Sequence, residues 1–209
     1  MEWYRIFSLT IPSTWLAFIL AAVITGIVIY INFNKETSSQ LIDLIFMFIL
    51  VWKFSVVLTE FSSIIKHPWM ILYFSGGRTG VYIGVMGVIL NLFYRQIQHK
   101  SLPSNRALAL AFISFYSSFA VLVVLLNRSS ILDTVLVLIV AILMTLLMLN
   151  YRGTIHLVLP FLLVYCILHL ILRETIFSTT MITAFIFGAF LILFRRRFDY
   201  KSAVELMKK

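Results

Sequence analysis

The chain has 209 residues, of which 62% are hydrophobic and only 12% are charged, and its mean hydropathy is +1.04. A soluble domain averages about 25% charged residues, and a fold of this size leaves much of its surface in water. The composition therefore excludes the soluble globular, disordered and disulfide-scaffold classes. It predicts an all-α, polytopic integral membrane protein.

Apolar runs separated by polar breaks predict about seven membrane-spanning helices, because about 20 helical residues cross a bilayer core about 30 Å thick. The first run is longer than a signal-peptide core and no clear cleavage site follows it, so we interpret it as a retained span. The spans form one transmembrane domain, 1–209, with a basic tail at 195–209. In chain order they cover 13–33, 41–60, 80–94, 107–126, 131–150, 155–173 and 176–194.

The distribution of Lys and Arg predicts the orientation in the membrane. Loops on the side of the C-terminus carry eleven of the 17 basic residues, the other side carries five, and Lys53 lies inside the second span. Basic loops stay in the cytoplasm, so we expect the N-terminus outside and the C-terminus in the cytoplasm. This bias explains the net charge of +9 without a nucleic-acid partner. The basic tail is either such an anchor, which we favour, or a patch for anionic lipid.

Charged residues inside membrane spans are costly, and each one marks a candidate functional site. Lys53 either extends its amine toward the outer interface or binds an anionic group within the bundle. The pair Gly77 and Arg78, just before the third span, either forms a turn or presents backbone N–H groups and a guanidinium to a phosphate. Both alternatives remain open for each of these positions.

The third span begins in a glycine-rich stretch, GGRTGVYIGVMG. Gly76, Gly80 and Gly84 recur every four residues, which is the small-residue pattern that allows helix backbones to approach closely. Gly87 extends this stretch, and helix packing explains Gly84 and Gly87 well. We therefore predict that Gly80, Gly84 and Gly87 form a helix-packing face.

Metal and redox chemistry have little support in the sequence. The single cysteine, Cys166, excludes an internal disulfide or a CxxC pair, and no H-x-x-x-H or H-E-x-x-H spacing occurs. We predict no metal site and no cofactor. His169 lies near the outer end of the sixth span, and Arg173 follows it one turn later on the same face.

Four stretches of the chain occur in an order that resembles a known family. They are VWKFSV, HPWMILYFSGGRTGVYIGVMG, GTIHLVLPFLLVYCILHLILRE and FGAFLILFRRR. Their order and loop lengths are similar to those of the prolipoprotein diacylglyceryl transferases of bacterial membranes. In this comparison Lys53 stands at the family's arginine, Gly153 and Tyr165 match, and His169 and Arg173 stand at the Arg and Glu positions.

The resemblance implies a multi-pass protein of the bacterial plasma membrane that binds phosphatidylglycerol between its helices. The family transfers the diacylglyceryl group to the lipobox cysteine of a lipoprotein precursor. The chain departs from the family at the motif histidine, which would fall near Val81 or Tyr82. It also lacks the G-R-x-G-N-F signature, to which only Asn127 and Arg128 are vaguely similar, and the outer head region. The chain keeps cations such as Lys53 and Arg78, but an apolar residue or a tyrosine stands at the family's acid/base position. This combination favours a lipid-binding bundle with lost or altered chemistry.

Membrane phospholipid is thus the expected partner, with lipoprotein precursors if transfer occurs. The alternative is a non-catalytic membrane partner or assembly subunit that packs against another protein through its glycine-rich third helix. A small-solute transporter has less support, because the spans are not obviously duplicated in two halves. No catalytic residue is assigned, and the candidates for lipid-headgroup binding are Lys53, Gly76, Gly77, Arg78, Tyr82, Arg128, His169 and Arg173.

Overall fold

The computed structural model describes residues 2–6, 9–69, 71, 76–98, 102–150, 154–172 and 178–207, with only the backbone for 6, 9, 154, 155 and 195–207. A short hairpin of strands β1 (Trp3–Ile6) and β2 (Leu9–Pro12) precedes the helices. The helical elements are α1 Ser13–Asn32, α2 Lys35–Phe54, α3 Val56–Thr59, α4 Phe61–Lys66, α6 Gly77–Ile97, α7 Asn105–Leu126, α8 Ile131–Asn150, the 3₁₀ turn η1 Thr154–Leu157, α9 Val158–Ile171 and α10 Thr179–Met207.

Within the described residues, five helical segments are long and apolar enough to cross a membrane: Ser13–Asn32, Lys35–Thr59, Gly77–Ile97, Asn105–Leu126 and Ile131–Asn150. Two further apolar helices, Val158–Ile171 and Thr179–Phe194, are shorter. The expectation of a helical, multi-pass membrane protein is confirmed at this level. The count of seven spans and the orientation stay predictions.

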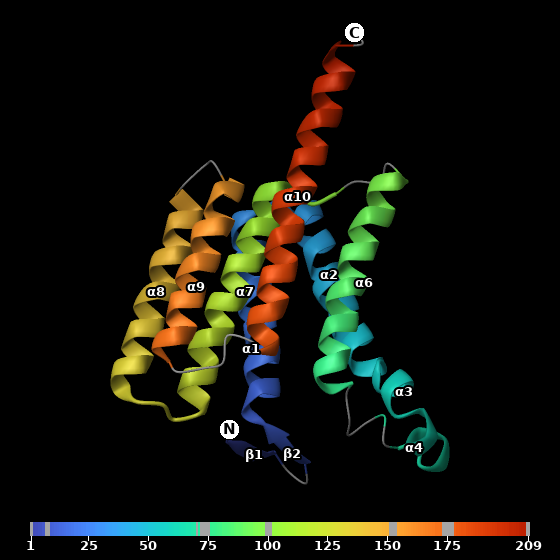
Figure 1. The fold of residues 1–209 in the computed structure, drawn as a ribbon, viewed down its shortest axis with the longest axis vertical. Coiled ribbons are helices and arrows are strands. Elements are labelled where there is room, and N and C mark those ends of the chain that lie inside the picture. The colour runs from blue at the N-terminus through green and yellow to red at the C-terminus, as the bar shows by residue number, and fades with distance from the viewer. Residues whose placement is uncertain are drawn as a thin grey trace.

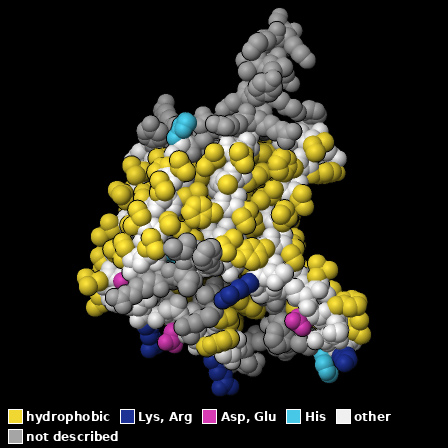
Figure 2. Space-filling model, in the orientation of Figure 1, with side chains coloured by type: hydrophobic (Ala, Val, Ile, Leu, Met, Phe, Trp, Pro, Cys, Tyr) yellow, Lys and Arg dark blue, Asp and Glu magenta, His cyan; other side chains and the backbone are white. Residues whose placement is uncertain are grey.

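The long helices run alternately up and down through the bundle (Figure 1). The N-terminus and the hairpin lie at one end, which we call the hairpin end, and the C-terminus lies beyond the other. Helix α10 continues past the other helices to Met207, so the backbone of the predicted basic tail is mostly an extension of the last helix. The middle of the face in Figure 2 is largely hydrophobic, and its visible charged side chains gather toward the hairpin end.

The N-terminal hairpin was not anticipated from the sequence. Its strands pair antiparallel, with Trp3 opposite Pro12 and Ile6 opposite Leu9. It is fixed to the end of α7, where the Tyr4 hydroxyl donates to the Leu126 carbonyl oxygen at 2.6 Å. The Oδ1 atom of Asn127 accepts from the Glu2 backbone N–H at 3.0 Å and from the Ser13 hydroxyl at 2.8 Å. These bonds tie the start of the chain to the α7–α8 turn.

The start of α2 follows capping chemistry more closely than hydropathy. Helix α2 begins six residues before the predicted start at residue 41, because the Asn34 side chain accepts from the Thr37 backbone N–H at 3.1 Å and Glu36 lies in the first turn. Such a cap satisfies one of the free N–H groups of a helix start. A carboxylate in the first turn also interacts favourably with the helix dipole.

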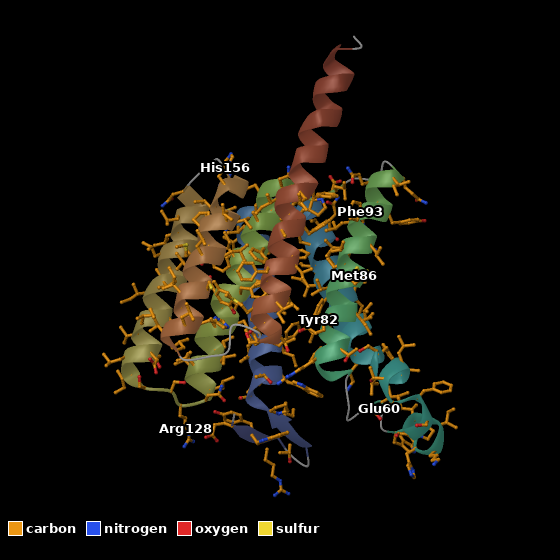
Figure 3. The ribbon with its side chains drawn as sticks, viewed as in Figure 1. Glu60, Tyr82, Met86, Phe93, Arg128 and His156 are labelled. Atoms are coloured by element: carbon orange, nitrogen blue, oxygen red, sulfur yellow. The ribbon has the colours of Figure 1, made fainter. Side chains whose placement is uncertain are left out.

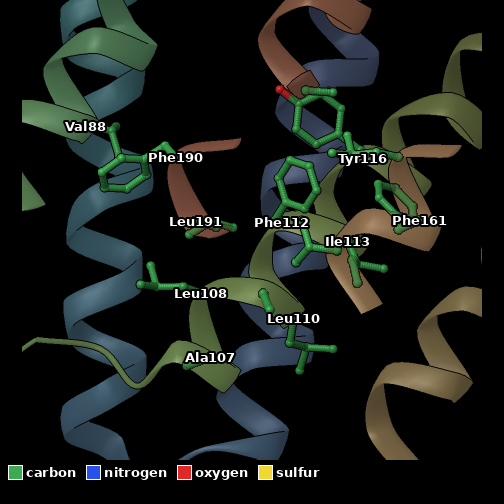
Figure 4. Close-up of a cluster of buried hydrophobic side chains, with 14 of the residues drawn as sticks. Val88, Ala107, Leu108, Leu110, Phe112, Ile113, Tyr116, Phe161, Phe190 and Leu191 are labelled. Atoms are coloured by element: carbon green, nitrogen blue, oxygen red, sulfur yellow. The ribbon is translucent and has the colours of Figure 1, made fainter. Parts of the chain in front are cut away.

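The core surrounds α7, which contributes more buried residues than any other described helix. Phe112 lies at its centre, with ring centroids 5.0 Å from Tyr116 and 5.6 Å from Phe161 of α9 (Figure 4). A second aromatic group joins α6 to α10 near the end opposite the hairpin. There, Phe93 of α6 lies 5.5 Å from Phe190 and 5.8 Å from Phe194, between ring centroids.

Candidate functional site

A cavity of about 520 Å³ lies among α1, α2, α6, α7 and α10. It extends along α1 from Thr14 to Thr25, along α2 from Leu41 to Trp52, and along α6 from Gly77 to Val88. Each pair is separated by eleven residues, which corresponds to ~16 Å of helix at a rise of 1.5 Å per residue. The cavity is therefore about as deep as one leaflet, half of the ~30 Å hydrocarbon core.

Aromatic rings from three helices form one wall of the cavity. The Phe18 ring of α1 lies 5.3 Å from Phe48 and 5.1 Å from Trp52, both in α2, and 5.2 Å from Phe115 of α7. The rings of Trp15 and Trp52 meet edge to face at 5.5 Å. Such a wall suits an apolar ligand, because binding sites of this size are lined mainly by hydrophobic and aromatic side chains.

Arg78 lines the cavity at the hairpin end, beside Thr14 and Trp15 of α1 and the hydroxyl side chains of Ser178, Thr179 and Thr180. Its side chain is exposed and makes no hydrogen bond or ion pair with the described residues. We call this group of residues the cavity mouth. A guanidinium here presents five N–H donors to any anion at the entrance.

Lys53 lies in the last turn of α2 and is half-buried. Its Nζ atom is 5.8 Å from the centroid of the Trp15 ring, which is a cation–π distance and links α2 to α1. Trp15 itself lines the cavity. The structure therefore brings Lys53 to the edge of the mouth, one aromatic ring away from the lining.

The glycines at the start of α6 have two roles: some allow close contact with α2, and one forms a turn. A Cβ at Gly80 would lie 3.1 Å from both Cδ1 and the carbonyl oxygen of Trp52, and one at Gly84 would lie 2.9 Å from the Phe48 ring. A Cβ at Gly76 would collide with the Ser55 hydroxyl. These three positions pack on α2, whereas a Cβ at Gly87 would be 3.6 Å from Val51, an ordinary contact.

Gly77 has a turn-forming role that glycine explains directly. Its φ of +56° is in the left-handed region, where other residues are strained. No atom of the described residues lies within 4 Å of an added Cβ, so the requirement shown is conformational and not steric. The turn directs the first residues of α6, including Arg78, to the cavity mouth.

The other headgroup candidates lie outside the lining. Tyr82 is adjacent to the lining residue Val81 but does not line the cavity itself. Arg128 is exposed in the α7–α8 turn, with φ of +51°, at the hairpin end (Figure 3). His169 is buried in α9 with its ring 4.6 Å from Tyr165, and Arg173 lies outside the described residues.

Sequence reasoning missed the polar side of the cavity. The Tyr116 hydroxyl of α7 donates to Thr183 Oγ1 of α10 at 3.1 Å, and Thr183 Oγ1 in turn donates to the carbonyl oxygens of Thr179 and Thr180 at 2.9 and 3.0 Å. The signal in the sequence was STTMIT, a run of hydroxyl residues at the start of an apolar segment. Ser and Thr in membrane helices commonly bond to backbone in this way.

Two further observations bound the chemistry of the site. Apart from Arg78 and Tyr116, the described lining residues have no ionisable side chain, so this described part of the lining holds no carboxylate or imidazole. No group of three or more His, Cys, Asp or Glu side chains within the described part of the chain is arranged to hold a metal ion.

Comparison of the chain with protein-family models, curated proteins and solved structures gives no match.

Proposed function

We propose that the protein binds an anionic phospholipid, with an acyl chain in the cavity and the phosphate at the cavity mouth. The observation that carries this proposal is the combination of an apolar cavity about one leaflet deep with a guanidinium at its end, Arg78, that has no bonding partner among the described residues. Arginine binds phosphate oxygens through paired, charge-assisted hydrogen bonds. Lys53 adds a second positive charge beside the mouth.

The headgroup contacts provide the specificity in this proposal. An acyl chain that moves from the bilayer into the cavity leaves one apolar phase for another, so it gains little from the hydrophobic effect. The electrostatic attraction at the mouth acts where protein and lipid lower the local dielectric constant, which strengthens it relative to water. Selection among lipids therefore depends on the charge of the headgroup.

Replacing Arg78 with glutamine is expected to reduce the phosphatidylglycerol retained by the purified protein by about tenfold, since a hydrogen bond to a charged group contributes about 1.5–3 kcal/mol. Quantitative mass spectrometry of the bound lipid provides the measurement. Arg128→Gln is the matched control, because Arg128 is an exposed cation at the same end but outside the cavity. Equal retention by both variants would refute headgroup binding at Arg78.

We propose further that this lipid-binding bundle is related to the diacylglyceryl transferases but has lost the transfer step. Acyl-group or diacylglyceryl transfer to a thiol needs an acid or base near the thiol. The absence of carboxylate and imidazole groups from the described lining supports the loss.

An assay with phosphatidylglycerol and a lipobox peptide is expected to show no transfer of the diacylglyceryl group above a protein-free control. An authentic transferase assayed in parallel establishes that the peptide and lipid are competent. Transfer by this protein that depends on its cavity would overturn the proposed loss and assign it as an enzyme of lipoprotein biosynthesis.

The proposed topology has seven spans, an outward N-terminus and a cytoplasmic C-terminus, in the plasma membrane of a bacterium. The alternating directions of the long helices support it, since they put the two termini at opposite ends of the bundle. In this arrangement the cavity mouth faces the outer leaflet. The shorter apolar helices α9 and Thr179–Phe194 would cross as part of the bundle.

The alternative, an assembly subunit that packs through the glycine-rich helix, draws less support. Gly80 and Gly84 pack against Trp52 and Phe48 of the same chain. The face that carries them is therefore already covered by α2. A partner protein would have to use a different surface of α6.

A further inference from the structure

The segment that follows α2 does not continue as a straight helix. We call residues 55–69, which include α3 and α4, the elbow. The backbone is interrupted at Glu60, whose φ and ψ of −128° and 36° are not helical. In Figure 1 the elbow projects away from the bundle at the hairpin end, beside the start of α6.

The elbow carries an apolar stripe that no other described element covers. Two of its members, Phe61 and Ile65, are four residues apart in α4 and lie near one face of that helix. Leu58 precedes the break at Glu60, in α3, and Trp69 follows the end of α4. Within α4, by contrast, Ile64 is buried, and Lys66 is exposed about 100° around the helix from Ile65 and about 140° from Phe61. The stripe consists of Leu58, Phe61, Ile65 and Trp69, which are 73%, 62%, 65% and 73% exposed.

The elbow stripe continues the outer surface of α2. Phe46, Leu50 and Phe54 are exposed on α2 at intervals of four residues, and Leu58 follows after another four. In a membrane-spanning α2 this surface faces lipid. The same lipid-facing line thus continues from the span into the elbow as far as Leu58, just before the break at Glu60.

The position of the second span decides where the elbow stripe lies. The predicted span 41–60 would cover ~30 Å, the whole hydrocarbon core. Phe61, Ile65 and Trp69 therefore begin at the edge of the core, and a straight continuation would expose them to water. Amphipathic segments at this level instead lie along the interface, with apolar side chains reaching the headgroup–acyl boundary. Tryptophan is enriched at the same level.

We infer that the elbow is an interfacial membrane anchor, whose stripe inserts into the leaflet at the hairpin end of the bundle. This inference does not depend on the proposed lipid-binding function. It has a consequence for the cavity mouth, since α3 contacts α6 and the Gly76 backbone N–H donates to the Trp52 carbonyl oxygen at 3.4 Å. The anchor holds the start of α6 at the depth of the lipid headgroups.

The test places an environment-sensitive fluorophore on single cysteines in the Cys166→Ala protein, reconstituted into phosphatidylcholine–phosphatidylglycerol vesicles. Ile65→Cys carries the label on the stripe, and Lys66→Cys carries it on a face about 100° away as the matched control. Lipids with a nitroxide near the top of the acyl chain are expected to quench the label at 65 several-fold more than the label at 66. Equal quenching would overturn the inference.

A label at 65 that is shielded both from lipid nitroxides and from a water-soluble quencher would also overturn it, by showing that protein covers the stripe. Hydrogen exchange of the unsubstituted protein gives a second measurement that does not depend on the variants folding. The amides of residues 58–69 are expected to exchange several-fold more slowly in lipid nanodiscs than in a short-chain detergent, while those of the exposed turn 127–130 do not change. Equal exchange of 58–69 in the two media would contradict the anchor.

Discussion

Substitution of Gly80 by leucine is expected to be among the most destabilising single changes in this protein. Overpacking a well-packed site costs about 1–3 kcal/mol for a few added methylenes, and leucine at Gly80 belongs at the upper end. Even its Cβ would lie 3.1 Å from the backbone carbonyl oxygen of Trp52, and it would collide with the Ser55 hydroxyl. Ser55 cannot simply turn away without loss, since its hydroxyl donates to that same carbonyl oxygen at 2.7 Å.

Thermal unfolding of the purified protein in detergent measures this effect. A loss of about 3 kcal/mol corresponds to a fall in Tm of roughly 6–12 °C for a chain of this length. Gly87→Leu is the control on the same helix, because a Cβ there meets Val51 at 3.6 Å. If Gly80→Leu unfolds at the same temperature as Gly87→Leu, the close approach of α2 and α6 is not a source of stability. A fall that disappears at high protein concentration would instead favour the assembly-subunit alternative.

Filling the cavity is expected to abolish lipid retention without unfolding the protein. Val85 is 8% exposed and lines the cavity on α6. A tryptophan at this position places an indole where the acyl chain would lie, and we expect at least a tenfold fall in co-purified phosphatidylglycerol. The magnitude follows from the loss of more than about 1.4 kcal/mol of binding free energy when the ligand can no longer occupy its site.

Leu90→Trp is the matched control for this experiment, since Leu90 is five residues further along the same helix and 60% exposed. It adds the same indole to the outer surface, so its lipid content and its Tm should equal those of the unsubstituted protein. Retention of lipid by a folded Val85→Trp protein would place the acyl chain outside the cavity. Combined with Arg78→Gln, the two variants separate the contribution of the cavity from that of the mouth.

The extent of the helices was predictable where hydropathy alone defines them. Helix α8 spans 131–150 as predicted, because polar residues flank both its ends in the sequence, and α1 ends within one residue of its prediction. Helix α2 was predicted to start too late, because capping by Asn34 carries the helix through a polar first turn. The hairpin depends on pairing between its two strands and on docking to Asn127, which lies more than a hundred residues away in the sequence.

The candidate site shows a similar division. Charge identified Lys53 and Arg78, since ionisable residues are conspicuous in so apolar a chain. Gly77 and Gly80 were recognised as unusual, but only the backbone distinguishes a left-handed turn from a helix contact. The cavity could not be predicted, because Phe18, Phe48 and Phe115 resemble any other core phenylalanine until three helices bring them together.

The aromatic group at Phe93 also has a mechanical consequence for α6. It joins α6 to α10 near one end of the bundle, whereas Arg78 lies fifteen residues away at the other. Helix α6 is thus held at two points, because Gly80, only two residues from Arg78, packs closely on Trp52 of α2. A helix held near both ends cannot pivot about either contact. The backbone of Arg78 therefore stays in place, and its side chain alone adjusts the width of the mouth.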